Sequence, residues 1–236
     1  MNQQPKHIGI ILDGNRRYAK RFGWNPWKGH EKGAEKFKDF LNWCEELGVN
    51  EVTAYCFSMQ NFNRTAEEVN FLMKIFTKST KKTLKKENIK QLKEKDVRIK
   101  FIGRTHLLPE ELQKLMKDLE KETKDHTKNK INIAIAYGGK EEITDAVKEI
   151  AKEITENKIR PEEITEETIT EHLQLKTEPD LIIRTSGEKR TSNFLPWQSA
   201  YSEWFFIDKT WPEIQKEDLK QAIEEYITKR QRRYGK

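Results

Sequence analysis

The sequence predicts an α/β protein with a mostly parallel central sheet of about six strands, flanked by helices. Short apolar runs alternate along the chain with amphipathic stretches of helical period, which indicates repeated strand–helix–strand units. Gly48, Gly103 and Pro161 fall in the connections between these runs. The 236 residues contain no internal repeat, low-complexity segment or long linker, so we expect one domain over residues 1–236.

The predicted strands are apolar runs at 8–12, 52–57, 97–102, 131–136, 180–184 and 204–207. The predicted helices are the amphipathic stretches at about 32–47, 66–94, 109–125, 140–156, 166–173 and 216–232. Ligands of open parallel sheets bind beyond the carboxyl ends of the strands. Asp13, Ser58 and Arg184 each lie at or just past the end of a predicted strand. We therefore expect them to meet at one edge of the sheet.

The charge distribution argues against a nucleic-acid binder. The net charge is +6 and the isoelectric point is about 9.1. Lysine and glutamate are nevertheless interleaved along the helical stretches, as on solvated helix faces. Only the tail, Lys229–Arg233, is a dense basic cluster. We expect no nucleic-acid partner.

The cysteines and the apolar runs indicate the compartment. Cys44 and Cys56 show no C-x-x-C spacing and cannot build a disulfide framework, which favours a reducing environment. No uncharged run approaches the length that crosses a bilayer, and no apolar N-terminal stretch follows basic residues. We expect a cytoplasmic protein that is at most peripheral to the membrane.

The first candidate site is the segment Asp13-Gly14-Asn15-Arg16-Arg17, directly after the first strand. A helix that begins here offers free N–H groups and the positive end of its dipole to an anion. Gly14 permits close backbone approach, and the arginines donate charge-assisted hydrogen bonds. Asp13 would repel a bare diphosphate, so a bridging Mg²⁺ best explains its position. The alternative is an ordinary helix N-cap; the flanking arginines favour the anion site.

The second candidate site follows the second predicted strand. Ser58, Asn61 and Arg64 recur every three residues, so one helical or 3₁₀ turn would align them. The alternative is a loop whose polar side chains bind its own backbone, and this segment alone does not decide between the two.

The third candidate site is Arg184–Ser192, in which arginines, a lysine and hydroxyl residues surround a glycine. This is the composition of an anion nest, and purely structural turns are rarely so rich in cations. Glu203 is a second candidate metal carboxylate. It precedes its predicted strand, at the opposite end from Asp13, which weakens a same-chain pairing of the two carboxylates. A dimer could resolve this if the partner chain donates Glu203.

Two further features remain open between structure and function. His30 could contact a phosphate or be structural, and the other histidines have no metal-ligand spacing. Val69, Leu72, Met73 and Phe76 form one apolar stripe on the helix predicted at 66–94. Such a stripe usually faces a core, but it could also wall an apolar tunnel.

With these residues in view, the chain resembles a cis-prenyltransferase of the undecaprenyl diphosphate synthase family, of the archaeal type. The similarity runs from His7 to Gly235. It rests on motifs in a fixed order: HIGIILDGNRRYA, GH at 29–30, FSMQNFNR, AYGG at 136–139, DLIIRTSGEKRTSNFLPWQSAYSEWFF and RRYG.

The resemblance implies a Mg²⁺-dependent enzyme that adds isopentenyl diphosphate repeatedly to an allylic primer, farnesyl or geranylgeranyl diphosphate. The product would be a long polycis-polyprenyl diphosphate, a lipid-carrier precursor that brings the enzyme into peripheral contact with a membrane. By the same resemblance, Asp13 and Glu203 hold the metal, and Asp13 and Asn61 are catalytic. The implied substrate-binding residues are Gly14, Asn15, Arg16, Arg17, Tyr18, His30, Ser58, Met59, Gln60, Phe62, Arg64, Arg184, Arg190, Thr191 and Ser192. Arg233 and Gly235 resemble a tail that completes the neighbouring active site of a homodimer.

The chain departs from the family pattern at several positions. Tyr18 stands for the usual tryptophan and Pro26 for an arginine; Gln60 and Phe62 replace glutamate and tryptophan, and Lys189 replaces histidine. These changes keep the phosphate sites but leave the primer and the product length open. Cys56 lies beside the expected tunnel and could shorten the product.

Three alternatives compete with an elongating synthase. A short-chain or single-transfer prenyltransferase that uses another acceptor would explain the substitutions at Pro26, Gln60 and Lys189. A non-catalytic subunit of a heteromeric synthase would require lost catalytic residues, which are all present here. A nucleic-acid binder would depend on the basic tail and lose its salt-sensitive binding when residues 229–236 are removed.

Overall fold

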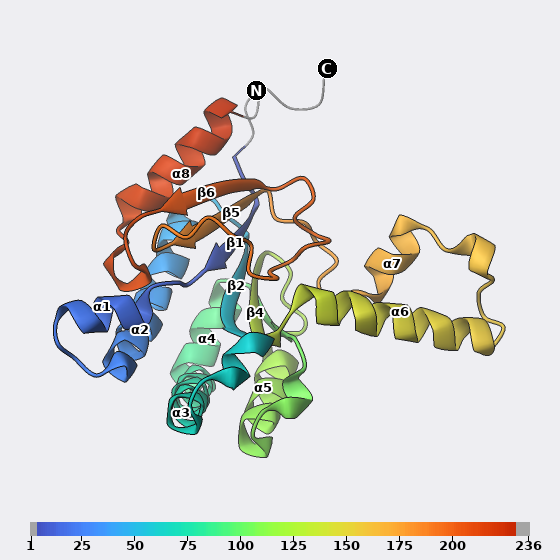
Figure 1. Cartoon of the computed structure of the whole chain (residues 1–236), viewed down its shortest axis with the longest axis horizontal. Helices are drawn as coiled ribbons and strands as arrows, with labels where there is room; N and C mark the ends of the chain where they lie inside the picture. The colour runs from blue at the N-terminus through green and yellow to red at the C-terminus, as the bar shows by residue number, and fades with distance from the viewer. Residues whose placement is uncertain (1–3, 230–236) are drawn as a thin grey trace.

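The computed structural model describes residues 4–229 and contains one six-stranded sheet (Figure 1). All neighbouring strands are parallel, in the order β3-β4-β2-β1-β5-β6. The strands are β1 (His7–Ile11), β2 (Glu51–Ser58), β3 (Val97–Ile102), β4 (Asn129–Tyr137), β5 (Leu181–Thr185) and β6 (Glu203–Ile207). The predicted fold class is confirmed, and each predicted strand agrees with an observed one within two residues.

Eight α-helices accompany the strands within the described range. They are α1 (Asn15–Arg21), α2 (Pro26–Glu46), α3 (Ala66–Thr83), α4 (Lys86–Glu94), α5 (Glu110–Thr123), α6 (Gly139–Thr155), α7 (Glu166–His172) and α8 (Lys216–Lys229). The helices predicted at 109–125, 140–156 and 166–173 are confirmed as α5, α6 and α7. The last three residues of the helix predicted at 216–232 lie outside the described residues.

The single helix predicted at 66–94 is wrong, because α3 and α4 are separate. Lys85 adopts an extended conformation (φ −63°, ψ 142°) between them. The Asn88 side chain donates to the Lys82 carbonyl oxygen at 2.6 Å, which stabilises the end of α3. The turn lets Ile89 and Leu92 of α4 pack on Val97, beside β3. Tertiary packing thus overrides a continuous helical pattern.

Helix α2 begins six residues earlier than predicted. Asn25 is its N-cap and accepts a hydrogen bond from the Trp27 amide at 3.1 Å, and Pro26 occupies the first turn. Asparagine followed by proline is a recognised helix start, so the sequence contains a signal that the apolar periodicity alone does not reveal.

The helices on one face of the sheet enclose a continuous apolar core. Near β1 and β5, residues of α2 and α8 such as Phe40 and Ile223 pack on Ile8 and Ile10. Near β4, α3 and α5 contribute Leu72, Met73, Leu112 and Met116. The apolar stripe of α3 therefore lies in this core layer, facing α5 and the sheet.

The opposite face is covered differently. The segment after β5 places Phe194 and Leu195 on Tyr55 and Ile182. Helix α6 and the short α7 extend away from the sheet as an arm (Figure 1). This face of the sheet is therefore covered in part by an irregular segment, which also contains the third candidate site.

A close contact between α1 and α2 fixes the first candidate site. A Cβ added to Gly29 would lie 2.0 Å from the Asn15 carbonyl oxygen. Only glycine permits this approach. The beginning of α1 is thereby held against α2, which also presents His30.

Gly29→Ala is expected to destabilise the protein by about 1–3 kcal/mol, because the two helices must separate to admit the methyl group. Helix propensity alone predicts the opposite sign, a gain of up to about 1 kcal/mol. Urea unfolding followed by circular dichroism measures the change, with Glu31→Ala on an exposed position of α2 as control. An unfolding midpoint at or above that of the unsubstituted protein would contradict the contact.

Candidate active site

An ion pair between the ends of two neighbouring strands forms the centre of the site. Asp13 lies two residues beyond β1, and Arg184 is the fourth residue of β5, paired with Ile11. The Arg184 Nη2 atom donates to Asp13 Oδ2 at 2.7 Å. Arg184 is only 3% exposed, so the pair places a largely desolvated positive charge beside a carboxylate. Asp13 and Arg184 meet at one sheet edge, as the strand pattern predicts.

The loop after β5 closes around the same arginine. Arg184 Nη1 donates to Ser192 Oγ at 2.6 Å and to the Arg190 carbonyl oxygen. Ser186, Ser192, Asn193 and Leu195 all have positive φ values between 49° and 78°. Non-glycine residues adopt this conformation at a cost and often do so at ligand sites. The third candidate site is therefore a shaped loop organised by Arg184; Arg190 and Thr191 are exposed on it.

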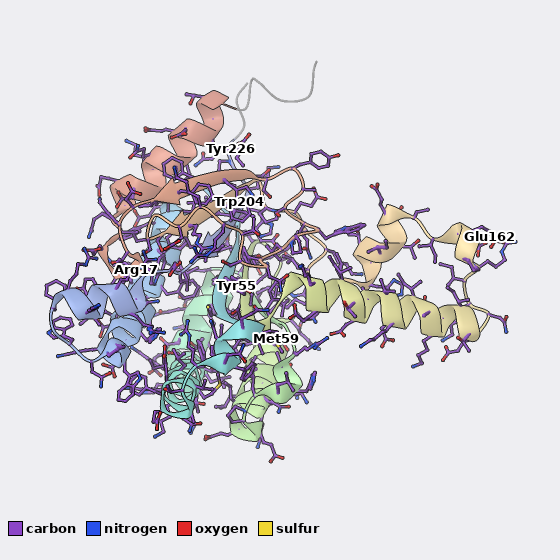
Figure 2. The ribbon with its side chains drawn as sticks, in the orientation of Figure 1. Arg17, Tyr55, Met59, Glu162, Trp204 and Tyr226 are labelled. Atoms are coloured by element: carbon purple, nitrogen blue, oxygen red, sulfur yellow. The ribbon has the colours of Figure 1, made fainter. Side chains whose placement is uncertain are left out.

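Arg17 of α1 connects the first site to this loop. Its Nη1 atom donates to the Ser186 carbonyl oxygen at 2.9 Å, and its guanidinium lies 3.6 Å from Asp13 Oδ1 and 3.4 Å from Glu188. Gly14, with φ of 98°, donates its amide to Asp13 Oδ1 at 2.7 Å. Figure 2 shows Arg17 beside the ends of the central strands. The first and third predicted clusters thus form one site.

A pocket of about 500 Å³ opens beside these residues. Its lining includes three cations and one carboxylate: Arg17, Lys20, Arg21, Ser186, Asp208 and Thr210. The Ser186 hydroxyl is buried and has no protein partner among the described residues. An anion in the pocket would meet a positive wall.

Glu68 is a buried carboxylate that the sequence analysis did not single out. It lies in the first turn of α3 and is 7% exposed. Arg64 Nη1 and His30 Nε2 lie 3.0 and 3.3 Å from its Oε1 atom, and Arg16 Nη1 lies 3.6 Å from Oε2. Glu68 therefore gathers three predicted substrate-binding residues from α1, α2 and the end of the 3₁₀ turn that precedes α3.

This environment controls the charge of His30. Burial, together with the positive charges of Arg64 and Arg16, lowers the pKa of His30 to about 4, although Glu68 opposes the shift. The imidazole is therefore neutral at pH 7, and its Nε2–H donates to the Glu68 carboxylate. No clear sequence signal marks Glu68, because it is one of 39 acidic residues and its partners lie up to 52 positions away.

The second candidate site forms the predicted 3₁₀ turn, Met59–Asn63. Asn61 Oδ1 accepts a hydrogen bond from the Ser58 amide at 2.9 Å, and Arg64 ends the turn. Its link to the other sites is indirect: Gln60 donates to Glu141 at 3.4 Å, and Glu141 accepts from Asn193 at 2.7 Å. Glu141 is a second connecting carboxylate that the sequence analysis missed, although it lies two residues after the AYGG motif.

Two apolar residues of this turn belong to the core layer. Met59 and Phe62 pack against the cluster of α3, α5 and β4, and the Phe62 ring lies 4.9 Å from that of Phe57. Met59 is labelled in Figure 2 at the end of β2, below Tyr55. Tyr18 lies elsewhere, on α1, with its ring 5.0 Å from that of Phe22.

The structure separates Glu203 from Asp13. Glu203 opens β6 and pairs with Leu181, the first residue of β5, whereas Asp13 follows the other end of the sheet. Within the described residues, no three histidine, cysteine or acidic side chains gather as a metal site. A Mg²⁺ ion needs only one or two carboxylates when phosphates and waters complete its shell, and the half-exposed Asp13 fits that role. Arg233 and Gly235 lie outside the described residues.

The comparisons with known proteins agree with this geometry. The prenyltransferase family model for undecaprenyl diphosphate synthases matches residues 11–235. The chain is 48% identical to the tritrans,polycis-undecaprenyl-diphosphate synthase (geranylgeranyl-diphosphate specific) of Methanocaldococcus jannaschii, over 98% of this chain and 83% of that one. The protein of the same description from Methanopyrus kandleri is 45% identical, over 98% and 85%.

Two solved structures show the same fold. Lavandulyl diphosphate synthase from Lavandula x intermedia, in complex with dimethylallyl diphosphate, has a TM-score of 0.89 and 34% identity over 98% of this chain and 97% of that one. A probable undecaprenyl diphosphate synthase from Campylobacter jejuni has a TM-score of 0.79 and 28% identity over the full length of both chains. The family model covers nearly the whole chain, and the relatives named above are 45% and 48% identical to it. The chain therefore belongs to the undecaprenyl diphosphate synthase family of prenyltransferases.

Proposed function

We propose that this prenyltransferase is a Mg²⁺-dependent synthase that adds isopentenyl diphosphate repeatedly to geranylgeranyl diphosphate. The observation that carries the proposal is the union of two cationic clusters about the Asp13–Arg184 pair. Repeated condensation requires two diphosphates to bind side by side. Arg16, Arg17 and His30 on one side, and Arg184, Arg190 and Ser192 on the other, supply two such groups.

The charges of the site suit the departure of a diphosphate. Loss of diphosphate from an allylic carbon leaves a resonance-stabilised cation, so the main task is to neutralise the leaving group. Mg²⁺, when bound, supplies Lewis-acid stabilisation of that group. A diphosphate that binds Arg184 replaces Asp13 as its partner and leaves the carboxylate free for a cation. A proton leaves as the new double bond forms, and the departing diphosphate is the available base. Asn61, whose Oδ1 accepts a hydrogen bond from the Ser58 amide, would assist this transfer by hydrogen bonding.

The apolar layer supports a growing chain. Met59, Phe62, Val69 and Phe76 are only partly buried against the core cluster of α3. Each five-carbon unit that leaves water gains up to about 4 kcal/mol, at about 0.8 kcal/mol per CH₂ group. Elongation along such a surface is favourable, and slow release follows. Within residues 4–229, no helix is long and apolar enough to cross a membrane.

The choice of primer and product follows the curated relatives. Several of them, at 43–48% identity, are described as specific for geranylgeranyl diphosphate and as making undecaprenyl diphosphate. Lavandulyl diphosphate synthase, at 34% identity, shows by its name that the same fold also serves a shorter product. A single-transfer enzyme is therefore the second candidate, and product length distinguishes the two.

A homodimer completes the proposal. β6 is an edge strand and carries Trp204 (Figure 2). Trp204 and Phe206 are only partly buried, and their rings stack with centroids 6.0 Å apart. The neighbouring Tyr201 is 65% exposed. An aromatic edge of this kind is suited to a second copy of the chain. Glu203 begins the same strand and, in a dimer, would reach the partner's Asp13.

Purified protein with labelled isopentenyl diphosphate, Mg²⁺ and geranylgeranyl diphosphate is expected to give a ladder that ends near eleven isoprene units. Farnesyl diphosphate should be a poorer primer. Asp13→Ala should lower turnover by about 10²-fold or more, because both the metal carboxylate and the Arg184 partner are lost. Reversed-phase chromatography resolves the products, with the exposed Asp118→Ala as control. A single short product would favour the single-transfer enzyme, and no incorporation would refute both.

Glu68→Gln is expected to raise KM for the primer about tenfold or more, because two arginines and the neutral His30 imidazole lose their common anchor. The KM for isopentenyl diphosphate should change little, since Glu68 contacts none of the residues of the Arg184 loop. Glu68→Asp should restore part of the primer affinity. Steady-state kinetics with each substrate varied separately measures both constants. An equal rise of both KM values would indicate a general loss of structure instead.

Asp13→Ala and Glu203→Ala are expected to complement each other when co-expressed. If Glu203 acts across a dimer, each mixed dimer has one intact site, so random pairing restores about a quarter of normal activity. The tagged mixed dimer, isolated by two affinity steps, should show about half of normal activity per dimer. No activity above that of either single variant would mean that both residues act in the same chain or that Glu203 has another role.

A further inference from the structure

The segment from α1 to the start of α2 has an unusual composition, of which the proposed function uses only Arg16, Arg17 and His30. Residues 14–30 contain five lysines and arginines and four aromatic residues, but no aspartate or glutamate. With 39 acidic residues in 236, a segment of this length would hold about three at the chain average. Elsewhere in the chain lysine and glutamate are interleaved, so this segment differs from an ordinary solvated surface.

The aromatic side chains of this segment gather at the surface. Phe22 is 54% exposed, and its ring stacks on Trp24 with centroids 4.9 Å apart. Trp27 is partly buried and stacks on Phe71 of α3 at 5.7 Å. The α1–α2 turn forms the outer edge of the molecule, away from the α6–α7 arm (Figure 1). The Phe22 ring is therefore presented outward, and Trp24 and Trp27 keep part of their surface accessible.

Lysines border the rings. Lys20 and Lys28 are exposed, and Lys28 Nζ lies 4.6 Å from the centre of the Trp24 ring. Among residues 4–229, neither amine has a carboxylate oxygen within 4 Å. Arg21 is different, because it pairs with Glu213. We call Lys20, Phe22, Trp24, Trp27 and Lys28 the aromatic–basic face.

We propose that the aromatic–basic face docks the enzyme on the surface of an anionic lipid bilayer. Tryptophan and phenylalanine partition into the headgroup region of bilayers, and nearby lysines add attraction to anionic lipids. A second copy of this chain is a poorer occupant, since two such faces would repel each other. The positive charge and the absence of acidic residues are complementary to a negatively charged surface.

The position of this face gives docking a consequence. α1 carries the face at its end and Arg16 and Arg17 at its beginning. A bilayer at the α1–α2 turn would therefore lie close to the site that holds diphosphates, where amphiphilic primers and products must pass. Docking needs no substrate, so its test is independent of the proposed reaction.

Flotation with phosphatidylcholine vesicles, with and without phosphatidylglycerol, tests the proposal on the substrate-free protein. We expect binding to the anionic vesicles only, and about tenfold weaker binding when salt rises from about 50 mM to about 500 mM. Phe22→Ser/Trp24→Ser and Lys28→Glu should each weaken binding at least about tenfold. Activity in detergent with soluble substrate should remain unchanged.

Matched variants keep the test specific. Leu107→Ser removes another exposed apolar side chain, and Lys90→Glu/Lys148→Glu reverses two lysines on other helices; both should bind vesicles normally. Circular dichroism and light scattering establish that each variant is folded and has an unchanged mass. The proposal would be overturned if the protein bound neutral vesicles equally well, or if it did not bind anionic vesicles at low salt. Unchanged binding by the two face variants, or a change of mass in these variants alone, would also overturn it.

Discussion

The ion pair of Asp13 and Arg184 is the interaction about which the site is built. A guanidinium that is 3% exposed must be paired, because an uncompensated buried charge is strongly destabilising. Here its partners are Asp13, Ser192 and the Arg190 carbonyl oxygen. The pair thus joins the end of β1 to the loop after β5. It also accounts for a carboxylate at the centre of a cationic site, because Asp13 compensates the buried charge of Arg184.

Most of the sheet and one edge of the site are predictable from the sequence. Parallel strands that are buried on both faces have continuous apolar sequences. Ligand-binding residues follow at the carboxyl ends of these strands, where the apolar sequence stops. Asp13 and Arg184 are therefore recognisable before any coordinates are known. The opposite position of Glu203 follows from the same rule, since its strand starts at this residue.

The remaining features depend on tertiary contacts that leave little local signal. Glu68 and Glu141 are ordinary in sequence, and only folding brings Arg16, His30 and Asn193 to them. The division between α3 and α4 is hidden because the apolar period continues through Lys85. The early start of α2 is a different case. Asn25 and Pro26 are a recognised signal for the start of a helix, but the apolar periodicity, which is weak before residue 32, placed the predicted start later.

The left-handed residues of the Arg184 loop have a consequence for engineering. Replacing a non-glycine residue of positive φ by glycine is a usual way to relieve backbone strain of about 1 kcal/mol. In this chain such positions include Ser186, which lines the pocket, and Ser192, whose hydroxyl binds Arg184. The changes that a thermostability screen would select first are therefore ones that alter the candidate active site. Substitutions that raise the thermal stability of this enzyme should therefore be sought outside the Arg184 loop. Within the loop, a gain in thermal stability would be expected to cost activity.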